Sequence, residues 1–489
     1  MKKTKRYKFV SVFIVVGFSM SVMGITLSAN VNQPVATQGR SARTARPKVL
    51  HMLYTTDEAD AAAIQAVLPE YEKKTGIQIN LTTEPYNNLQ QKVFQELANK
   101  SSHYDVMVID TPWMPDLTGD LSPITSYLAN PAVGKQLNVK DFIPKVFYDT
   151  TVYNPKKPWV SPPDQSNINV TQIQKEGFQI YGLPIQANVL TLSYRKDLFD
   201  NSANQKAFKK EYGFKLQPPT TWNQFLEVAK FFTNPNQNMY GTTLMPGVGD
   251  WATDDFKTFL ASWGGNGRLI NNQLEPVFDT PQALKALTFY NNLINKFKVV
   301  PPGTTTFGWD EAATTFDAGL TAMSMNYHTV ALASNVKGGH IDYAMVPGNI
   351  IHGKMVRAPH FGTWELAINK YSHNQQAAFN FISWLTSTPI QEQMLKEQLH
   401  PTRISVYKYA QRDKALTAQF GDFYEVLGKS LAIGVGRPRI SNYSEVDNAI
   451  ATAVNNIVTQ NGNIQSNLNS AKQQVLNLLR QAGYKPGHQ

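Results

Sequence analysis

The chain contains no cysteine. Disulfides, thiolate metal sites and cysteine nucleophiles are therefore excluded. Charged residues are also sparse, at 17% of the 489 residues, compared with roughly 25% in an average soluble protein. Because only 36 residues are acidic, few carboxylates are available to lose their pairing at low pH. This scarcity suggests, as a hypothesis, an acidic exterior as the working environment; a secreted protein of neutral surroundings and unusual composition is the alternative.

Recognisable catalytic and nucleotide-binding motifs are absent as well. Gly428-Lys429-Ser430 has the form of the end of a phosphate-binding loop, but the glycine required five positions earlier is Phe423. Neither a His-Glu-x-x-His nor a Gly-x-Ser-x-Gly motif occurs. Asp254 and Asp255 are neighbours that point apart on a helix, whereas a retaining glycosidase needs two carboxylates about 5 Å apart. Four isolated histidines are interpreted as structural or solvated: His51, His328, His352 and His360. The sequence predicts no enzyme, no cofactor and no metal site.

The length and the charge distribution limit the fold and the partners. A chain of 489 residues is too long for one hydrophobic core and suits two domains. The net charge is +10, but residues 1–48 contain nine basic residues and no acidic one, which leaves +1 for the rest. A body so close to neutrality is not a binding surface for a polyanion. Nucleic acid is therefore excluded as a partner.

The N-terminus has the composition of a secretory signal. Five basic residues between positions 2 and 8 precede an apolar run over residues 9–27. Residues 1–29 are predicted to be a signal peptide cleaved near Ser28–Asn30, or alternatively an uncleaved N-terminal anchor, since a run of 19 residues could just span a bilayer. Residues 30–47 lack an apolar pattern and are predicted to be a flexible linker.

The next segments alternate between strand and helix patterns. Residues 49–54, 77–81 and 104–110 are predicted strands, separated by helical patterns, and Gly76 is the expected helix stop. Such alternation favours a parallel sheet with crossover helices. Ligands of these sheets lie outside the carboxyl ends of the strands. The candidate cleft residues at these ends, with ordinary helix caps and loop aromatics as the alternative, are Thr56, Asp57, Asp110 and Trp113.

A second strand pattern in the middle of the chain indicates a family. Val189 to Tyr194 alternates apolar and hydroxylic residues, within the stretch Tyr181-Gly-Leu-Pro to Lys196-Asp-Leu-Phe199. This stretch resembles the "YGLP … YNKDLF" crossover strand of family 1 extracellular solute-binding proteins, the sugar-binding partners of ABC importers. The passage Tyr71 to Ile77 is similar to the family's "FEKKTGI". The resemblance extends over nearly the whole chain after Lys48.

The resemblance implies an α/β fold with two lobes, the type II-like periplasmic-binding-protein fold, in which each lobe is a sheet flanked by helices. Three hinge crossings would join the lobes. The implied N-terminal lobe contains residues 48–187 and 303–357, and the C-terminal lobe contains residues 188–302 and 358–489. The chain has no lipidated cysteine, by which many Gram-positive members of the family are tethered to the membrane.

Aromatic, amide and carboxylate residues at loop positions form the candidate ligand site. Flat aromatic side chains suit the apolar C–H face of a sugar, and carboxylates or amides accept hydrogen bonds from its hydroxyls. The resemblance places the turn at Trp263-Gly264-Gly265 beside the sugar, and Tyr327 stands where many members have a tryptophan. Core packing is the alternative for each aromatic residue, and it is the expectation for Trp222. The candidate residues beyond Trp113 are Gln186, Asn188, Trp251, Asp254, Trp263, Trp309, Tyr327, His328 and Trp364.

We therefore expect an extracytoplasmic binding protein, at the cell surface or in the periplasm. The expected function is capture of a mono- or oligosaccharide between two lobes and delivery to the permease subunits of an ABC transporter, by a monomer. The alternatives are an extracellular carbohydrate-active enzyme and a ligand sensor for a membrane receptor. Polyamine, phosphate-ester or iron ligands are also compatible with this general architecture.

Overall fold

The computed structural model describes residues 47–56, 59–327, 340–460 and 462–487. The predicted signal or anchor segment lies outside these residues, as do nearly all of the predicted linker and the candidates Asp57 and His328. Within the described ranges, no helix has both the length and the apolar character needed to cross a membrane.

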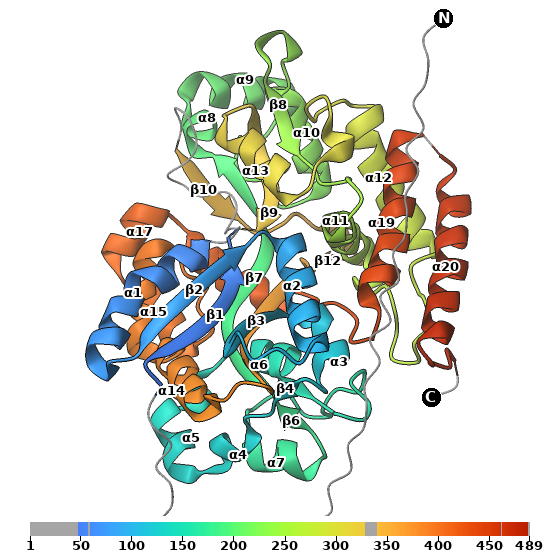
Figure 1. Ribbon diagram of the computed structural model, residues 1–489. Helices are drawn as coiled ribbons and strands as arrows, with labels where there is room; N and C mark the ends of the chain where they lie inside the picture. The colour runs from blue at the N-terminus through green and yellow to red at the C-terminus, as the bar shows by residue number, and fades with distance from the viewer. Residues whose placement is uncertain (1–46, 57–58, 328–339, 461, 488–489) are drawn as a thin grey trace, which may run out of the picture. The chain divides into compact units, whose positions relative to one another are not determined.

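The first hydrophobic core is built on parallel strands. Strands β1 (Val49–Thr55), β2 (Gln78–Glu84) and β3 (Val106–Asp110) pair in parallel, with β1 in the middle. Helices α1 (Ala59–Thr75) and α2 (Tyr86–Ala98) connect them, as the alternating pattern predicted (Figure 1). Gly76 ends the first helix at φ +71°, a conformation that glycine adopts without steric cost. The predicted parallel sheet with crossover helices is therefore confirmed.

A long buried strand joins the first core to the second. Strand β7 (Gly182–Arg195) is buried along all 14 residues. Its first half pairs antiparallel with β13 (Phe361–Asn369), and its second half pairs with β9 (Thr321–Tyr327) and β10 (Ile341–Ala344). The resulting path is β2-β1-β3-β13-β7-β9-β8, where β8 is Tyr240–Thr243 (Figure 1). The crossover expected at this stretch is therefore present.

Helices and β8 surround the second core. Helix α10 (Trp222–Phe232) begins with a capping box between Thr221 and Gln224, and Trp222 is fully buried, as expected. Near the C-terminus, α19 (Tyr443–Thr459) and α20 (Ile464–Gln481) pack side by side (Figure 1). Among the other helices packed around this core are α11 (Asp250–Leu260), α12 (Pro281–Asn295) and α13 (Trp309–Asp317).

The remaining elements connect these layers. A smaller hydrophobic cluster, which includes Val189 and Phe361, lies between the two cores and is covered by α16 (Ile404–Ala410), α17 (Lys414–Phe420) and α18 (Phe423–Ile433). The shorter strands are β4 (Leu121–Ser122), β5 (Val152–Tyr153), β6 (Gln179–Ile180), β11 (Asn349–Ile351) and β12 (Lys354–Val356). The other helices are α3 (Met114–Leu117), α4 (Thr125–Ala129), α5 (Pro131–Leu137), α6 (Pro144–Thr151), α7 (Val170–Lys175), α8 (Lys196–Asp200), α9 (Ser202–Tyr212), α14 (Gln375–Leu385) and α15 (Thr388–Met394).

The strand pairing departs from the lobe boundaries implied by the resemblance. Strand β9, within the segment 303–357 expected in the N-terminal lobe, pairs with β8 and packs in the second core. Strand β13, within the segment 358–489 expected in the C-terminal lobe, pairs with β3 and packs in the first core. Both strands are buried along their whole length, so no alternation of buried and exposed positions distinguishes one partner strand from another.

Candidate ligand-binding site

A buried arginine connects acidic residues from both cores. Arg437 lies between α18 and α19, and its side chain is 3% exposed. Its guanidinium forms a bidentate pair with Asp250, in which Nε donates to Oδ1 at 3.2 Å and Nη2 donates to Oδ2. Nη1 lies 3.6 Å from Oδ1 of Asp110, and Nη2 lies 3.9 Å from Oδ2 of Asp254. Asp110 ends β3 in the first core, whereas Asp250 and Asp254 lie one turn apart on α11 in the second.

Two carboxyl groups of this cluster, those of Asp110 and Asp254, have raised pKa values. Burial raises the pKa of Asp110 to about 6, although Arg437 opposes the shift. Burial, followed by repulsion from Asp250, raises the pKa of Asp254 well above its ordinary value. For Arg437, burial alone would lower the pKa, but the three carboxylates raise it well above its usual range. The arginine is therefore permanently charged, and the acidic groups exceed it in number.

Tyr327 and His360 complete the polar part of the site. The hydroxyl of Tyr327 donates to Oδ2 of Asp254 at 2.9 Å and also contacts Nδ1 of His360. That imidazole nitrogen lies 3.0 Å from Oδ1 of Asp254. Burial lowers the pKa of His360 well below its ordinary value, with Lys257 and Arg437 acting in the same direction. His360 is therefore a neutral imidazole held between a phenol and a carboxyl group.

Aromatic side chains from both cores surround these groups. Tyr86, the first residue of α2, stacks on Trp364 with ring centroids 5.8 Å apart and planes at 26°. Its ring also lies 5.4 Å from that of Trp113 and 5.3 Å from that of Trp309. The ring centroid of Trp309 in turn lies 5.4 Å from that of Trp251 and 5.9 Å from that of Tyr327. The hydroxyl of Tyr86 donates to Oδ2 of Asp110 at 2.7 Å, which ties the aromatic cluster to the carboxylates.

Several buried polar atoms at this place make no hydrogen bond to another described residue. They include both amide atoms of Gln186, Nε1 of Trp251 and of Trp309, and Nη1 of Arg437. An unsatisfied buried donor or acceptor costs about 1–3 kcal/mol, so native proteins rarely leave many together. Such a set of donors and acceptors beside aromatic rings is suited to a ligand that carries several hydroxyl groups.

Most of the predicted site residues meet here. We call this set the junction site, and it contains Asp110, Trp113, Gln186, Trp251, Asp254, Trp309, Tyr327 and Trp364, together with Tyr86, Asp250, His360 and Arg437. Gln186 belongs to it because it lies opposite Trp364 in the pairing of β7 with β13. Asn188 lies further along β7, and its Oδ1 accepts from the backbone of Val189. Thr56 is exposed, and its backbone N–H donates to Glu84.

Trp263 is a predicted site residue that packs in the second core, away from the junction site. Its ring packs beside Trp222, Phe259 and Phe289 in the second core, at the far end of α11 from Asp254. The structure therefore does not bring this tryptophan to the junction site.

Comparison with known protein families identifies the chain. The family model of the bacterial extracellular solute-binding proteins matches residues 55–392. The chain belongs to this family. A probable ABC transporter-binding protein of Deinococcus radiodurans is 26% identical over 405 residues, which cover 80% of this chain and 84% of the relative.

Solved structures support the same fold. A maltose-bound MalE3 structure from T. maritima superposes with a TM-score of 0.71 at 22% identity, covering 88% of this chain and all of the other. A solute-binding protein from Agrobacterium vitis with bound D-mannitol gives a TM-score of 0.68 at 22% identity, covering 89% and 99% of the two chains. This solute-binding protein therefore has the two-lobe fold of the periplasmic sugar-binding proteins.

Sequence reasoning missed four residues of the junction site in this solute-binding protein. Tyr86 follows β2 at the same carboxyl edge as Asp110, so the rule that selected Asp110 could also have selected Tyr86. Asp250 lies four positions before Asp254 on one helix face, a spacing that was also readable. His360 was interpreted as structural or solvated. Nothing in the sequence around Arg437 indicates its position.

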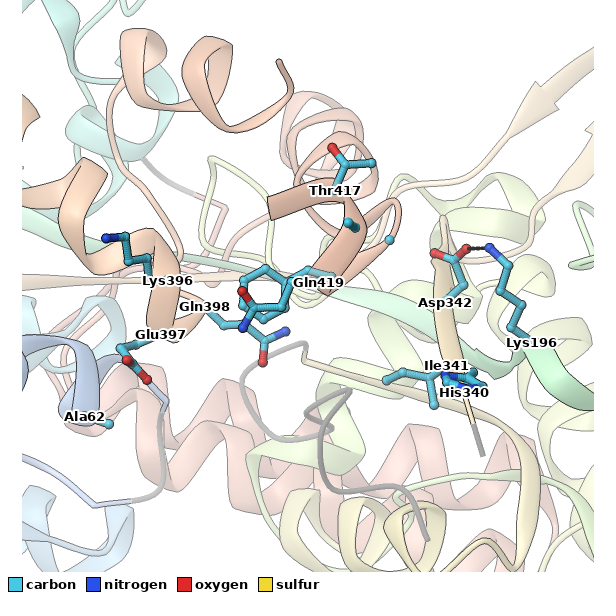
Figure 2. A pocket seen from close by; sticks show the side chains of 13 residues that line it. Ala62, Lys196, His340, Ile341, Asp342, Lys396, Glu397, Gln398, Thr417 and Gln419 are labelled. Atoms are coloured by element: carbon cyan, nitrogen blue, oxygen red, sulfur yellow. Dashed lines mark hydrogen bonds and ion pairs between the residues drawn. The ribbon is translucent and has the colours of Figure 1, made fainter. Parts of the chain in front are cut away.

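A cavity of about 470 Å³ lies apart from the junction site, and Figure 2 shows it. Residues from α17, β10 and the turn at Lys396–Gln398 line it. The ammonium of Lys196 donates to Oδ2 of Asp342 at 2.7 Å across one wall. Asp342 also accepts hydrogen bonds from the backbone of Tyr343 and Asp422. This carboxylate is already satisfied by the protein, and no predicted site residue lines the cavity.

Proposed function

We propose that this solute-binding protein captures a carbohydrate, either a mono- or an oligosaccharide, between its two lobes and delivers it to an ABC transporter. The observation that carries the proposal is the junction site. There, Trp364, Tyr86 and Trp309 meet the carboxyl groups of Asp110 and Asp254. A sugar offers an apolar C–H face to aromatic rings and hydroxyl donors to carboxylates, so this combination suits it.

Named relatives support the carbohydrate class. A mannitol-binding protein of Pseudomonas aeruginosa is 26% identical over 214 residues, 42% of this chain. The ligands named for the similar solved structures include maltose, D-mannitol and ribitol. Each of these is a sugar or polyol, with several hydroxyl groups and no charge. The donors and acceptors of the junction site match that chemistry.

The contacts of Arg437 suggest how the lobes close. Its guanidinium pairs with Asp250 on α11 and approaches Asp110 at the end of β3, so it connects the two cores directly beside the aromatic rings. In the proposed mechanism the lobes move about three hinge segments, and ligand stabilises the closed form through contacts with both. The protein binds as a monomer, works outside the cytoplasm and breaks no bond in the sugar.

Calorimetric titration over a panel of monosaccharides, polyols and oligosaccharides tests the proposal. At least one member of the panel should bind, and Trp364→Ala should weaken that binding. Burial of roughly 100 Å² of ring face contributes about 2.5 kcal/mol, a loss of roughly 60-fold in affinity. Trp384→Ala is the matched control, because this tryptophan is only partly buried and packs on α14 against Tyr71 and Phe381, outside the site.

Mass spectrometry of the recovered sugar separates binding from catalysis. Unchanged sugar together with a raised melting temperature supports the proposal. A cleaved product would instead establish a carbohydrate-active enzyme. If no member of the panel binds, or if Trp364→Ala lowers the melting temperature and leaves the affinity unchanged, the assignment of the junction site is wrong.

A further inference from the structure

A second groove lies on the surface of the second core. It is bordered by α12, by the segment Ala261–Gly265 that follows α11, and by β11, which forms an antiparallel hairpin with β12. Its volume is about 810 Å³, within the roughly 300–1,000 Å³ that ligand pockets occupy. Trp263 in this groove follows Asp254 of the junction site by nine residues along the same helical segment, about 13 Å at the rise of an α-helix. The two places are therefore separate.

Two aromatic rings line the groove. The ring of Trp263 stacks on that of Phe259 at 6.0 Å and 17°, and on that of Trp222 at 6.1 Å and 28°. The ring of Phe289 lies 5.2 Å from that of Trp263. Phe259 and Trp222 are fully buried, whereas Trp263 and Phe289 are only partly buried. The core therefore holds the rings of Trp263 and Phe289 in place while part of each surface lines the groove.

Uncharged polar side chains surround these rings. Gln282, Lys285, Phe289 and Asn292 follow one another at three- or four-residue spacing on α12, so they share a face. Asn349 of β11 lines the groove as well. The side-chain amides of Gln282, Asn292 and Asn349 make no hydrogen bond within the part of the chain that the structure describes. Of the eleven described residues that line the groove, Lys285 alone carries a charge.

We propose that this groove is a second carbohydrate-binding site, which takes a neutral oligosaccharide or a segment of a polysaccharide. Partly exposed aromatic surface suits the C–H face of a sugar ring. Free amides both donate and accept, as hydroxyl groups require. A single lysine without a carboxylate neither attracts a polycation nor provides enough charge for a polyanion. The site is independent of the junction site, so it adds a second point of attachment for a chain-like ligand.

The hairpin beside the groove raises the alternative of a protein contact. Ile350 of β11 is 57% exposed, which is unusual for a large apolar side chain. A stable interface between two copies would bury roughly 800 Å² on each, mostly apolar at its centre. Here the rings are flanked by amides that have no protein partner, and this favours a ligand rich in hydroxyl groups over a second copy of the chain.

Affinity electrophoresis in native gels tests the proposal. Separate gels contain soluble starch, pullulan, laminarin or hydroxyethyl cellulose. At least one of these polysaccharides should retard the wild-type protein. The variants Trp263→Ala and Gln282→Ala/Asn292→Ala should each weaken that retardation at least tenfold in apparent dissociation constant. The double variant removes only side chains without protein partners, so it leaves the fold intact even if Trp263→Ala does not.

Two controls keep the groove separate from the junction site. Trp364→Ala should weaken the binding of small sugars and leave the retardation by polysaccharide unchanged. The groove variants should weaken the retardation and leave the binding of small sugars unchanged. Trp384→Ala should affect neither. Absence of retardation in every gel, or unchanged retardation of the double variant, would overturn the proposal. Dimers in light scattering that Ile350→Glu dissociates would also overturn it, because the groove would then be an interface between copies.

Discussion

Replacing Arg437 by methionine tests how much the buried cation stabilises the carboxylates of the junction site. The substitution keeps a long unbranched side chain but removes the cation that lies among Asp110, Asp250 and Asp254. Two of these carboxyl groups are almost fully buried, with exposed side-chain fractions of 1% and 0%. Their charges would then remain in the interior without their principal partner.

The expected loss of stability is large and depends on pH. Removing one partner of a buried ion pair costs about 3–5 kcal/mol, because an uncompensated charge stays behind. The pKa of Asp110 is already raised by burial to about 6, and that of Asp254 is raised well above its ordinary value. Without the guanidinium, which lowers both values, they rise further. Protonation therefore removes the penalty in acid, and the loss should be greatest at pH 8 and much smaller at pH 5.

Guanidinium chloride unfolding at pH 8 and at pH 5 measures this difference. Arg412→Met is the matched control, because Arg412 is exposed and its side chain makes no hydrogen bond or ion pair to another described residue. The control should change stability by less than about 0.5 kcal/mol at either pH. A loss below about 1 kcal/mol for Arg437→Met at pH 8, or an equal loss at both pH values, would refute this account of the cluster.

Three further predictions follow from the same residues and from the two-lobe fold. Tyr86→Phe removes the hydrogen bond that lowers the pKa of Asp110, so this pKa should rise, and carbon-13 NMR titration of the carboxyl group will show whether it does. Burial raises the pKa of Asp255 to about 7 as well. Protonation of such a carboxyl group stabilises the folded state relative to the unfolded state. This contribution is complete below the unfolded-state pKa of about 4 and is lost as the pH rises through the folded-state pKa. The melting temperature should therefore hold or rise from pH 8 to pH 5, and a steep collapse below pH 5 would rule out the hypothesis of an acidic exterior. Small-angle scattering should show a smaller radius of gyration at saturating sugar, and an unchanged radius would contradict lobe closure.

Local sequence patterns were sufficient to predict several of the helices and strands. The strands at 49–55, 78–84 and 106–110 and the helix stop at Gly76 depend on neighbouring residues, so each was predictable without the fold. The family was readable for the same reason, because the stretch from Tyr181 to Phe199 is continuous. The opposite directions of Asp254 and Asp255 were predictable from helix geometry: the former accepts a hydrogen bond from Tyr327 and the latter from Tyr290.

Only the tertiary structure decided which distant segments meet. Strands β9 and β13 are both buried along their whole length, so no exposed face indicates in advance that β9 pairs with β8 and β13 with β3. Arg437 is separated by more than 300 residues from Asp110, and only the folded chain brings its guanidinium beside that carboxyl group and buries both. Trp263 and Trp364 both follow the pattern of ligand-binding aromatics, yet one lines a surface groove and the other stacks on Tyr86. A sequence shows what a side chain offers, whereas the packing of two cores determines which other groups it meets.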